Sequence, residues 1–358
     1  MPRDSSAFIV DRADRAALVV GGDDRASWLH GLLSNDIASL GAGQGCYSTC
    51  LTPQGRMIAD LHVVNLGPLM LLDVPEVART HLLERLEQFV ITEDVEVEDV
   101  SGRVRLIGVY GTAAASVLAR VLVSGGEADA VRLADSLSSL REDDAVVVGP
   151  LGGAKRARGF ELEAADAILV ANRDAGGPGF TVLVATSREA ALRAALHERD
   201  AGNLALSDWD ALRIEAGRPA FGIDMGADTI PLEAGLEDRA ISFTKGCYVG
   251  QEVIVRVRDR GHGRVARRLV GLVSPSGIEP AGTVIAAGDT VRVEAGDVGR
   301  VTSAAHSTAL AGVVALGYVH RDHADAGTPV VVVHEGREVP MTVATLPLLA
   351  RHDAGAAS

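Results

Sequence analysis

Residues 243–264, "FTKGCYVGQEVIVRVRDRGHGR", separate two parts of the chain that carry different patterns. Beyond them, short apolar runs recur at the roughly 8–12-residue spacing, with glycine-rich turns, that is typical of a small β-sandwich or β-barrel. The runs are "RRLVGLVS" (267–274), "TVIAAG" (283–288), "TVRVEAG" (290–296), "VGRVTSAA" (298–305), "VVALGYVH" (313–320), "TPVVVVHEG" (328–336) and "VPMTVATLPL" (339–348). We therefore expect a C-terminal β-barrel domain over 261–350 and a frayed tail at 351–358.

The part of the chain before this stretch mixes strand and helix patterns. Apolar runs predict strands at 15–22, 69–74, 104–111 and 179–186. Helix-like spacing of apolar residues predicts helices at 23–40, 75–90 and 187–200. Two further strands are expected on either side of a turn at "TPQG" (52–55). Helices and strands in this mixture predict the α+β class.

Composition excludes several classes of protein. The chain has 358 residues and a net charge of −14, so it repels DNA and anionic membranes as a whole. The first residues, "MPRDSSAFIV", lack the basic and apolar regions of a signal peptide, and no apolar run approaches the roughly 18 residues of a membrane span. Cys46, Cys50 and Cys247 form an odd, sparse set that suits a reducing compartment. We expect a cytoplasmic protein without DNA or membrane partners.

Cys247 lies at the centre of the quoted stretch. Gly246 and Gly250 allow the backbone to bend there or to approach a ligand closely. Lys245 and the arginines that follow favour the thiolate form of the cysteine. A lone cysteine is also commonly a small, buried hydrophobic residue. Two interpretations therefore stay open: a functional thiol with Lys245 as its electrostatic partner, or a packing residue.

Glu215 is the unusual residue of a helix expected in "LSDWDALRIEAGRPAFG" (206–222), where Ser207 suits the N-cap. An acid in the last turn faces the negative end of the helix dipole, which is mildly unfavourable. A salt bridge to Arg213 or Arg218, or solvation, compensates for this in one interpretation. In the other, the carboxylate accepts paired N–H donors from a ligand, such as the amidine-like edge of a pterin ring.

A group of arginines follows the cysteine in an otherwise acidic protein. If 253–260 is a strand, alternation places Arg256, Arg258 and Arg260 on one face. That face is either solvated and neutralised by the many acids of the chain, or it binds an anionic tail such as the glutamates of a folate. The sequence leaves both interpretations open.

Three motifs in this order, "LRIEAGRPAFG" (212–222), "IPLEAGL" (230–236) and "FTKGCYVGQE" (243–252), carry a family resemblance. The chain resembles the YgfZ family of folate-binding proteins, which are relatives of the glycine-cleavage T-protein (aminomethyltransferase) and are implicated in iron–sulfur cluster maintenance. The signature K-G-C-[aromatic]-x-G-Q-E, Lys245 to Glu252 here, distinguishes that family from the aminomethyltransferases. The resemblance covers nearly the whole chain and is weakest over about 112–180.

The resemblance implies a three-lobed fold around a central hole that binds tetrahydrofolate. Residues 1–260 would form the folate-binding region, with two interleaved α+β lobes at roughly 1–100 and 101–200 and with 201–260 returning to the centre. It places Cys247 and Lys245 at the functional surface. The residues expected to contact the folate are Glu215 on the pterin, Arg256 and Arg258 near the glutamate tail, and Tyr248 and Gln251.

One departure concerns catalysis. Aminomethyltransferases carry an aspartate, essential for methylene transfer, shortly after an early strand. The corresponding stretch here, "LLDVPEVART" (71–80), has no acid at 77–80, and Asp73 and Glu76 come too early. Without that carboxylate the charged intermediate loses its electrostatic partner. We therefore expect that the chain is not a classical aminomethyltransferase.

The expected function is that of a tetrahydrofolate-binding accessory protein that supports assembly or repair of iron–sulfur enzymes, with Cys247 as its key thiol. Its partners would be iron–sulfur proteins or their assembly factors. One cysteine cannot complete a four-thiolate cluster shell, so any cluster would need ligands from elsewhere. The alternatives are a folate-dependent aminomethyltransferase or other one-carbon transferase, and an interaction module that binds no folate.

Overall fold

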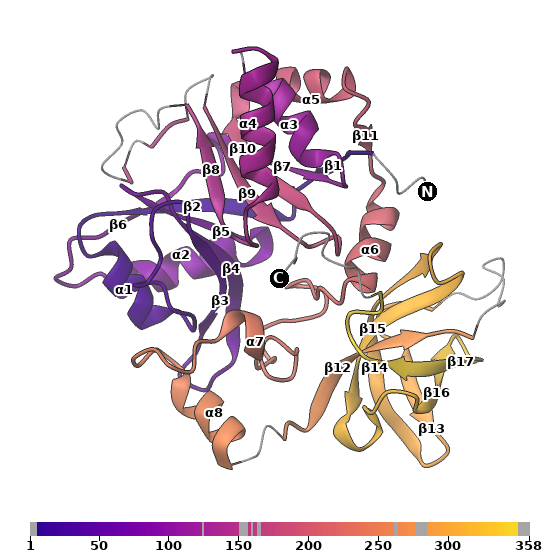
Figure 1. The fold of residues 1–358 in the computed structure, drawn as a ribbon. Helices are drawn as coiled ribbons and strands as arrows, with labels where there is room; N and C mark the ends of the chain where they lie inside the picture. Colours follow the sequence, from indigo (N-terminus) through magenta and orange to yellow (C-terminus); the bar gives the residue numbers. More distant parts are fainter. Residues whose placement is uncertain are drawn as a thin grey trace, which may run out of the picture.

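The computed structural model of the chain describes residues 6–123, 125–149, 157–158, 160–162, 166–260, 264–275 and 285–349. These residues form two β-sheets with helices on their outer faces and, beside them, a closed β-barrel (Figure 1). The α+β class and the C-terminal barrel expected from the sequence are confirmed. The tail at 351–358 lies outside the described residues.

The first sheet contains most of the N-terminal strands. Its order is β3-β4-β5-β2-β6, with bounds β2 Arg15–Gly21, β3 Gly45–Leu51, β4 Met57–Asn65, β5 Met70–Pro75 and β6 Glu96–Asp99. Helices α1 (Arg25–Leu32) and α2 (Arg79–Glu87) cover one face, where Trp28 and Leu82 join Leu61 in one buried cluster. A short 3₁₀ turn, η1 (Glu76–Ala78), links β5 to α2.

The second sheet packs against the free face of the first. Its order is β11-β1-β7-β10-β9-β8, with bounds β1 Phe8–Asp11, β7 Val104–Tyr110, β8 Ala145–Val148, β9 Ala167–Asn172, β10 Gly179–Ala185 and β11 Gly202–Asn203. Its outer face carries α3 (Ala114–Leu122), α4 (Glu127–Ser138) and, after the 3₁₀ turn η2 (Thr186–Arg188), α5 (Glu189–His197). Val64 and Leu71 of the first sheet share a core with Ile168 of the second, so the strands of both sheets are buried on two sides.

The barrel closes in the order β12-β15-β14-β13-β16-β17. The bounds are β12 Arg267–Val273, β13 Thr290–Val293, β14 Gly296–Ser307, β15 Gly312–His320, β16 Pro329–His334 and β17 Arg337–Ala344, with a 3₁₀ turn η4 at Arg321–His323. Six of the expected runs are strands. The run at 283–288 is not: its described part, 285–288, carries no strand, and residues 283–284 lie outside the described residues.

The segment between the second sheet and the barrel holds short helices. These are α6 (Leu206–Glu215), which packs on β14, then α7 (Glu237–Ala240), α8 (Gln251–Val255) and the π-helix η3 (Arg256–Arg260). The strand expected over 253–260 is therefore wrong. Val253 packs against the turn at Gly55, and Ile254 is buried, so tertiary contacts override the β-preference of this valine-rich run. Within the described residues, no helix is long and apolar enough to span a membrane.

Candidate functional site

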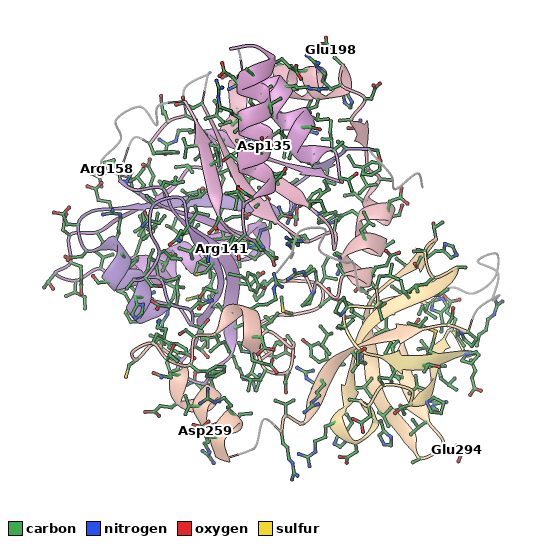
Figure 2. The ribbon with its side chains drawn as sticks, in the orientation of Figure 1. Asp135, Arg141, Arg158, Glu198, Asp259 and Glu294 are labelled. Atoms are coloured by element: carbon green, nitrogen blue, oxygen red, sulfur yellow. The ribbon has the colours of Figure 1, made fainter. Side chains whose placement is uncertain are left out.

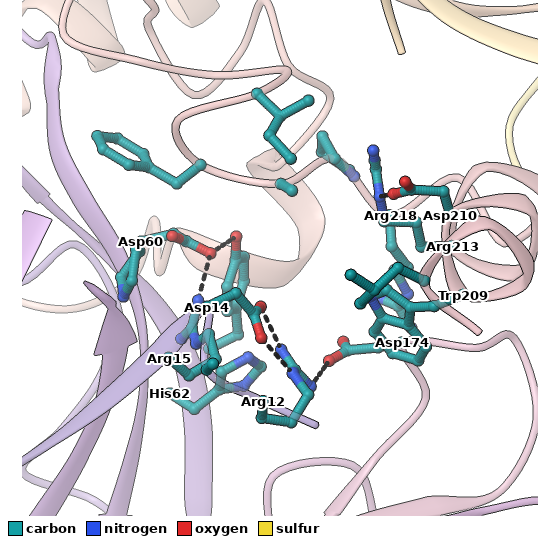
Figure 3. Close-up of a pocket in the computed structure, with 18 of the residues that line it drawn as sticks. Arg12, Asp14, Arg15, Asp60, His62, Asp174, Trp209, Asp210, Arg213 and Arg218 are labelled. Carbon is teal, nitrogen blue, oxygen red and sulfur yellow. Dashed lines mark hydrogen bonds and ion pairs between the residues drawn. The ribbon is translucent and has the colours of Figure 1, made fainter. Parts of the chain in front are cut away.

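A cavity of about 430 Å³ lies where the two sheets meet α6 and α7 (Figure 3). Figure 3 shows Asp60, Arg15 and His62 on one side and Asp210, Arg213 and Arg218 on the other. It is lined by residues 11–15, which connect β1 to β2, and by side chains of β3, β4, β5, α6 and α7. Asp174, which follows β9, and the 218–223 loop complete the lining. The volume falls in the range of small-molecule sites, roughly 300–1,000 Å³.

Asp60 has a carboxylate that is only half used. Its Oδ2 accepts a hydrogen bond from the Tyr47 hydroxyl at 2.8 Å and lies 3.6 Å from Nη1 of Arg15. Its Oδ1 is buried and has no hydrogen-bond partner among the described residues. A buried carboxylate oxygen without a donor is costly. Asp60 lines the cavity, so a ligand N–H that reaches this oxygen would remove that cost.

The charged groups around Asp60 hold it in place. Arg15 donates from Nε to Asp73 of β5 at 2.7 Å and lies between that residue and Asp60. Burial and the negative charge of Asp60 raise the pKa of Tyr47 well above its ordinary value, so the hydroxyl stays protonated and donates. This corner of the cavity is therefore ordered before any ligand binds.

Arg12 lies in the link between β1 and β2 and lines the cavity. It donates to Asp14 at 3.0 Å, to Asp174 at 3.0 Å and to the hydroxyl of Tyr110 at 2.8 Å. Its guanidinium also lies 5.2 Å from the ring centroid of Trp209 in α6. Burial opposes the ionised form of Asp174, but the charge of Arg12 outweighs it and lowers the pKa of that carboxyl.

Three further arginines line the cavity and pair with three carboxylates. Arg218 and Arg239 both approach Glu142, at 3.0 and 3.1 Å. Arg213 donates to Asp210 and to the buried carboxylate of Asp224, both at 2.7 Å. Arg218 and Arg239 therefore have one carboxylate between them, and a ligand carboxylate could supply a second partner.

Glu215 lies outside the residues that line the cavity. It is 1% exposed and accepts a hydrogen bond from the Ser307 hydroxyl of β14 at 2.6 Å. Its backbone carbonyl accepts from the amide of Leu348 at 2.8 Å. The helix begins at Leu206 after Ala205, so Ser207 is within the first turn rather than at the N-cap. The carboxylate thus takes part in the contact between α6 and the barrel.

Lys245 binds the end of α1. Its Nζ donates to the carbonyl oxygens of Leu33 at 2.6 Å, of Asn35 at 3.1 Å and of His30. Burial lowers the pKa of Lys245 to about 8. Unpaired carbonyls at a helix C-terminus are natural partners for a cation, so this lysine anchors the motif loop to the first lobe.

The rest of the KGCYVGQE motif surrounds that anchor. Cys247 is exposed, whereas burial raises the pKa of Cys46 and Cys50 to about 12. Tyr248 is buried, with its ring 5.0 Å from the Lys245 ammonium, and its amide donates to Gln251 at 3.3 Å. The structure brings Lys245, Tyr248 and Gln251 together, but none of the motif residues lines the cavity.

The predicted arginines Arg256 and Arg258 lie in the π-helix and not on a strand face. Arg258 pairs with Asp259 at 2.7 Å and stacks 4.0 Å above the ring centroid of Phe243. Asp259 lies at the edge of the molecule in Figure 2. Neither arginine lines the cavity, whereas Arg213, Arg218 and Arg239 do.

Comparison with known proteins identifies the fold. Residues 4–136 match the GCVT N-terminal domain, and residues 267–349 match the glycine cleavage T-protein C-terminal barrel domain. The crystal structure of glycine cleavage system aminomethyltransferase T from Bartonella henselae superposes with a TM-score of 0.80 at 23% identity, over 97% of this chain and 88% of that one. The chain has the aminomethyltransferase-like fold of the glycine cleavage T-protein.

Proteins of similar sequence match nearly the whole chain. A protein of Arabidopsis thaliana named "Putative transferase At1g60990, chloroplastic" is 27% identical over 97% of this chain and 72% of its own length. An aminomethyltransferase of Nostoc is 28% identical over 96% of this chain and 85% of its own length.

Within the described residues, no three His, Cys, Asp or Glu side chains form a group that could hold a metal ion.

Proposed function

We propose that the protein binds a reduced folate, tetrahydrofolate or a derivative of it, in the central cavity. The observation that carries this proposal is the buried Oδ1 of Asp60, which has no donor among the described residues. The amidine-like edge of a pterin presents N–H donors of the kind that this carboxylate lacks. The aminomethyltransferase-like fold supports the same ligand class.

The opposite wall of the cavity would hold the glutamate tail. Arg218 and Arg239 share Glu142, so a ligand carboxylate at this wall completes their pairing. Arg256 and Arg258 were expected from the sequence in this role, but they do not line the cavity. Glu215 was expected on the pterin, and to act there it would have to leave Ser307.

Titration with tetrahydrofolate in the absence of oxygen tests the proposal, with thermal unfolding as the measurement. Ligand at about 100 times Kd stabilises a folded site by about 2.7 kcal/mol, which gives a saturable rise in melting temperature. We expect Asp60→Ala, which removes the acceptor, to lose most of this rise and Glu215→Gln to keep it. No saturable rise in the wild-type protein would support the interaction module without folate. If the Asp60 variant keeps the rise and Glu215→Gln loses it, the pterin contacts Glu215 and not Asp60.

For the biological role, we propose an accessory function in assembly or repair of iron–sulfur enzymes, as in the YgfZ family, in the cytoplasm. The exposed thiol of Cys247 and the absence of an acid at 77–80 support it. Iron–sulfur proteins or their assembly factors would then be the partners. Cys247→Ser should abolish complementation of iron–sulfur enzyme activity in a deletion strain while tetrahydrofolate affinity is unchanged. Full complementation by this variant would contradict the role of the thiol.

A folate-dependent one-carbon transferase is the second candidate. The similarity to aminomethyltransferases favours it, and the cavity holds Asp14, Asp60 and Asp174, any of which could stabilise a cationic intermediate. A turnover assay with tetrahydrofolate and an aminomethyl donor distinguishes the two candidates. A rate that depends on Asp60 would establish the transferase and overturn the inference from the missing acid at 77–80.

A further inference from the structure

His62 lies on the same strand as Asp60 and lines the same cavity. The two residues are two positions apart on β4, so their side chains share one face of the sheet. Both contact Tyr47: its hydroxyl donates to Asp60, and its ring centroid lies 5.0 Å from that of His62. Asp60 and His62 therefore lie side by side and pack on the same tyrosine.

A buried carboxylate from the second lobe fixes the imidazole. Nδ1 of His62 lies 2.5 Å from Oδ1 of Asp143, and both side chains are about 9% exposed. The other ring nitrogen, Nε2, makes no hydrogen bond with any described residue, and it is not among the buried atoms that lack a partner. Because His62 lines the cavity, Nε2 is the nitrogen available to a ligand.

Two features of the backbone hold Asp143 in position for this contact. Asp143 has a φ of 72°, in the left-handed region that residues other than glycine seldom occupy. Its amide donates to the carbonyl of Ala171 at 2.8 Å, which holds the residue in that conformation. A Cβ at Gly45 would lie 2.1 Å from the Asp143 carbonyl oxygen, so only glycine permits this approach of β3.

We propose that the His62–Asp143 pair is a second recognition element of the cavity, in which the imidazolium donates a hydrogen bond from Nε2 to an oxygen of the bound ligand. With Asp60 as the acceptor, the strand then recognises an edge on which an N–H donor stands beside a carbonyl acceptor. A pterin has such an edge at its ring N–H and adjacent C=O. This assignment rests on the proposed folate function and names the groups that orient the ring.

The charges that face His62 come from several elements. Asp60 lies on its own strand, Tyr47 on β3, Asp73 on β5, Arg15 on β2, Asp143 before β8 and Asp174 after β9. Burial and the charge of Arg15 disfavour the imidazolium. The charge and hydrogen bond of Asp143, with a contribution from Asp73, outweigh both and raise the pKa of His62 above its ordinary value. The raised pKa widens the pH range in which both ring nitrogens are protonated and Nε2 can donate.

Affinity as a function of pH tests the inference, by calorimetric titration of tetrahydrofolate without oxygen between about pH 6 and pH 9. Wild-type affinity should fall as pH rises through the pKa of His62. His62→Gln should bind roughly 10- to 100-fold more weakly at low pH, because it loses a charged donor, and should lose this pH dependence. Asp143→Asn should move the fall in affinity to lower pH.

A structural role alone would not produce this shift in the pH profile. If the wild type binds tetrahydrofolate with an affinity that does not change with pH, the inference is wrong while the folate function stands. If the wild type binds none at any pH, both fail. Should His62→Gln not fold, the ¹⁵N shifts of the wild-type His62 ring decide: both nitrogens protonated in the complex at neutral pH support the inference, and an unprotonated Nε2 overturns it.

Discussion

Loss of the Asp224 carboxylate should destabilise the contact between the barrel and the wall of the cavity. The side chain has no exposed surface, and it accepts from four donors on three parts of the chain. Arg213 of α6 donates at 2.7 Å and the amide of Ala220 at 2.9 Å, while Thr302 and Ser303 of β14 donate at 2.5 and 2.7 Å. Arg213 and Ala220 also line the cavity. The Asp224 carboxylate therefore binds the cavity wall and strand β14 of the barrel at the same time.

Asp224→Ala removes one partner of a buried ion pair, which typically costs about 3–5 kcal/mol. Arg213 keeps Asp210 at 2.7 Å, and Thr302 keeps the Leu316 carbonyl at 3.2 Å, so the lower end of that range is expected. Asp224→Asn retains an acceptor oxygen and should lose less. The free energy of unfolding from urea denaturation, followed by circular dichroism, measures both variants.

The matched control is Asp297→Ala in the barrel. Asp297 is 61% exposed and pairs with Arg292 at 2.9 Å on the surface, so its loss should cost about 0–1 kcal/mol. If Asp224→Ala costs no more than Asp297→Ala, the buried carboxylate does not hold the barrel to the cavity wall. If Asp224→Asn is as damaging as the alanine variant, the ionic charge rather than the acceptor geometry dominates.

Further predictions concern other parts of the structure. Gly45→Ala should destabilise the fold by about 1–3 kcal/mol, because its Cβ would lie 2.1 Å from the Asp143 carbonyl, whereas Gly102→Ala, with no atom within 4 Å of its Cβ, should change the melting temperature little. Because its pKa is raised in the folded state, His62 contributes to the free energy of unfolding fully below about pH 6.5, and this contribution is lost as pH rises through the folded-state pKa. If stability changes with pH in the same way in His62→Gln as in the wild type, this prediction is wrong. Lys245→Met should cost about 1–3 kcal/mol in thermal unfolding, since it leaves carbonyls at the end of α1 without a donor, and a cost near zero would show that water replaces the ammonium.

The barrel was predictable because its strands are short, alternate in polarity and are separated by glycine turns, so local pattern and tertiary environment agree. The helix at α8 was not predictable in this way. Its valines and isoleucine favour a strand, and only the packing of Val253 on Gly55, from a distant turn, reveals the helical conformation. Local preference and tertiary contact conflict there.

In the candidate site, too, some residues have a local sequence signal and others depend on distant contacts. Asp60 and His62 alternate with Ala59, Leu61 and Val63 in "IADLHV", and two polar residues on one face of an apolar strand were a usable signal for buried polar groups. The sequence marks Glu215 as an acid in a last helical turn and offers Arg213 or Arg218, solvent or a ligand to compensate it. Its partner, Ser307, follows 92 residues later on the barrel, and no local pattern indicates such a contact.

A crystal structure of the protein with tetrahydrofolate would show which side chain the pterin contacts. We expect electron density for the pterin in the cavity between the two sheets, with a ring N–H within hydrogen-bond distance of Oδ1 of Asp60. Density against Glu215 or beside Cys247, with the cavity filled only by water, would contradict it.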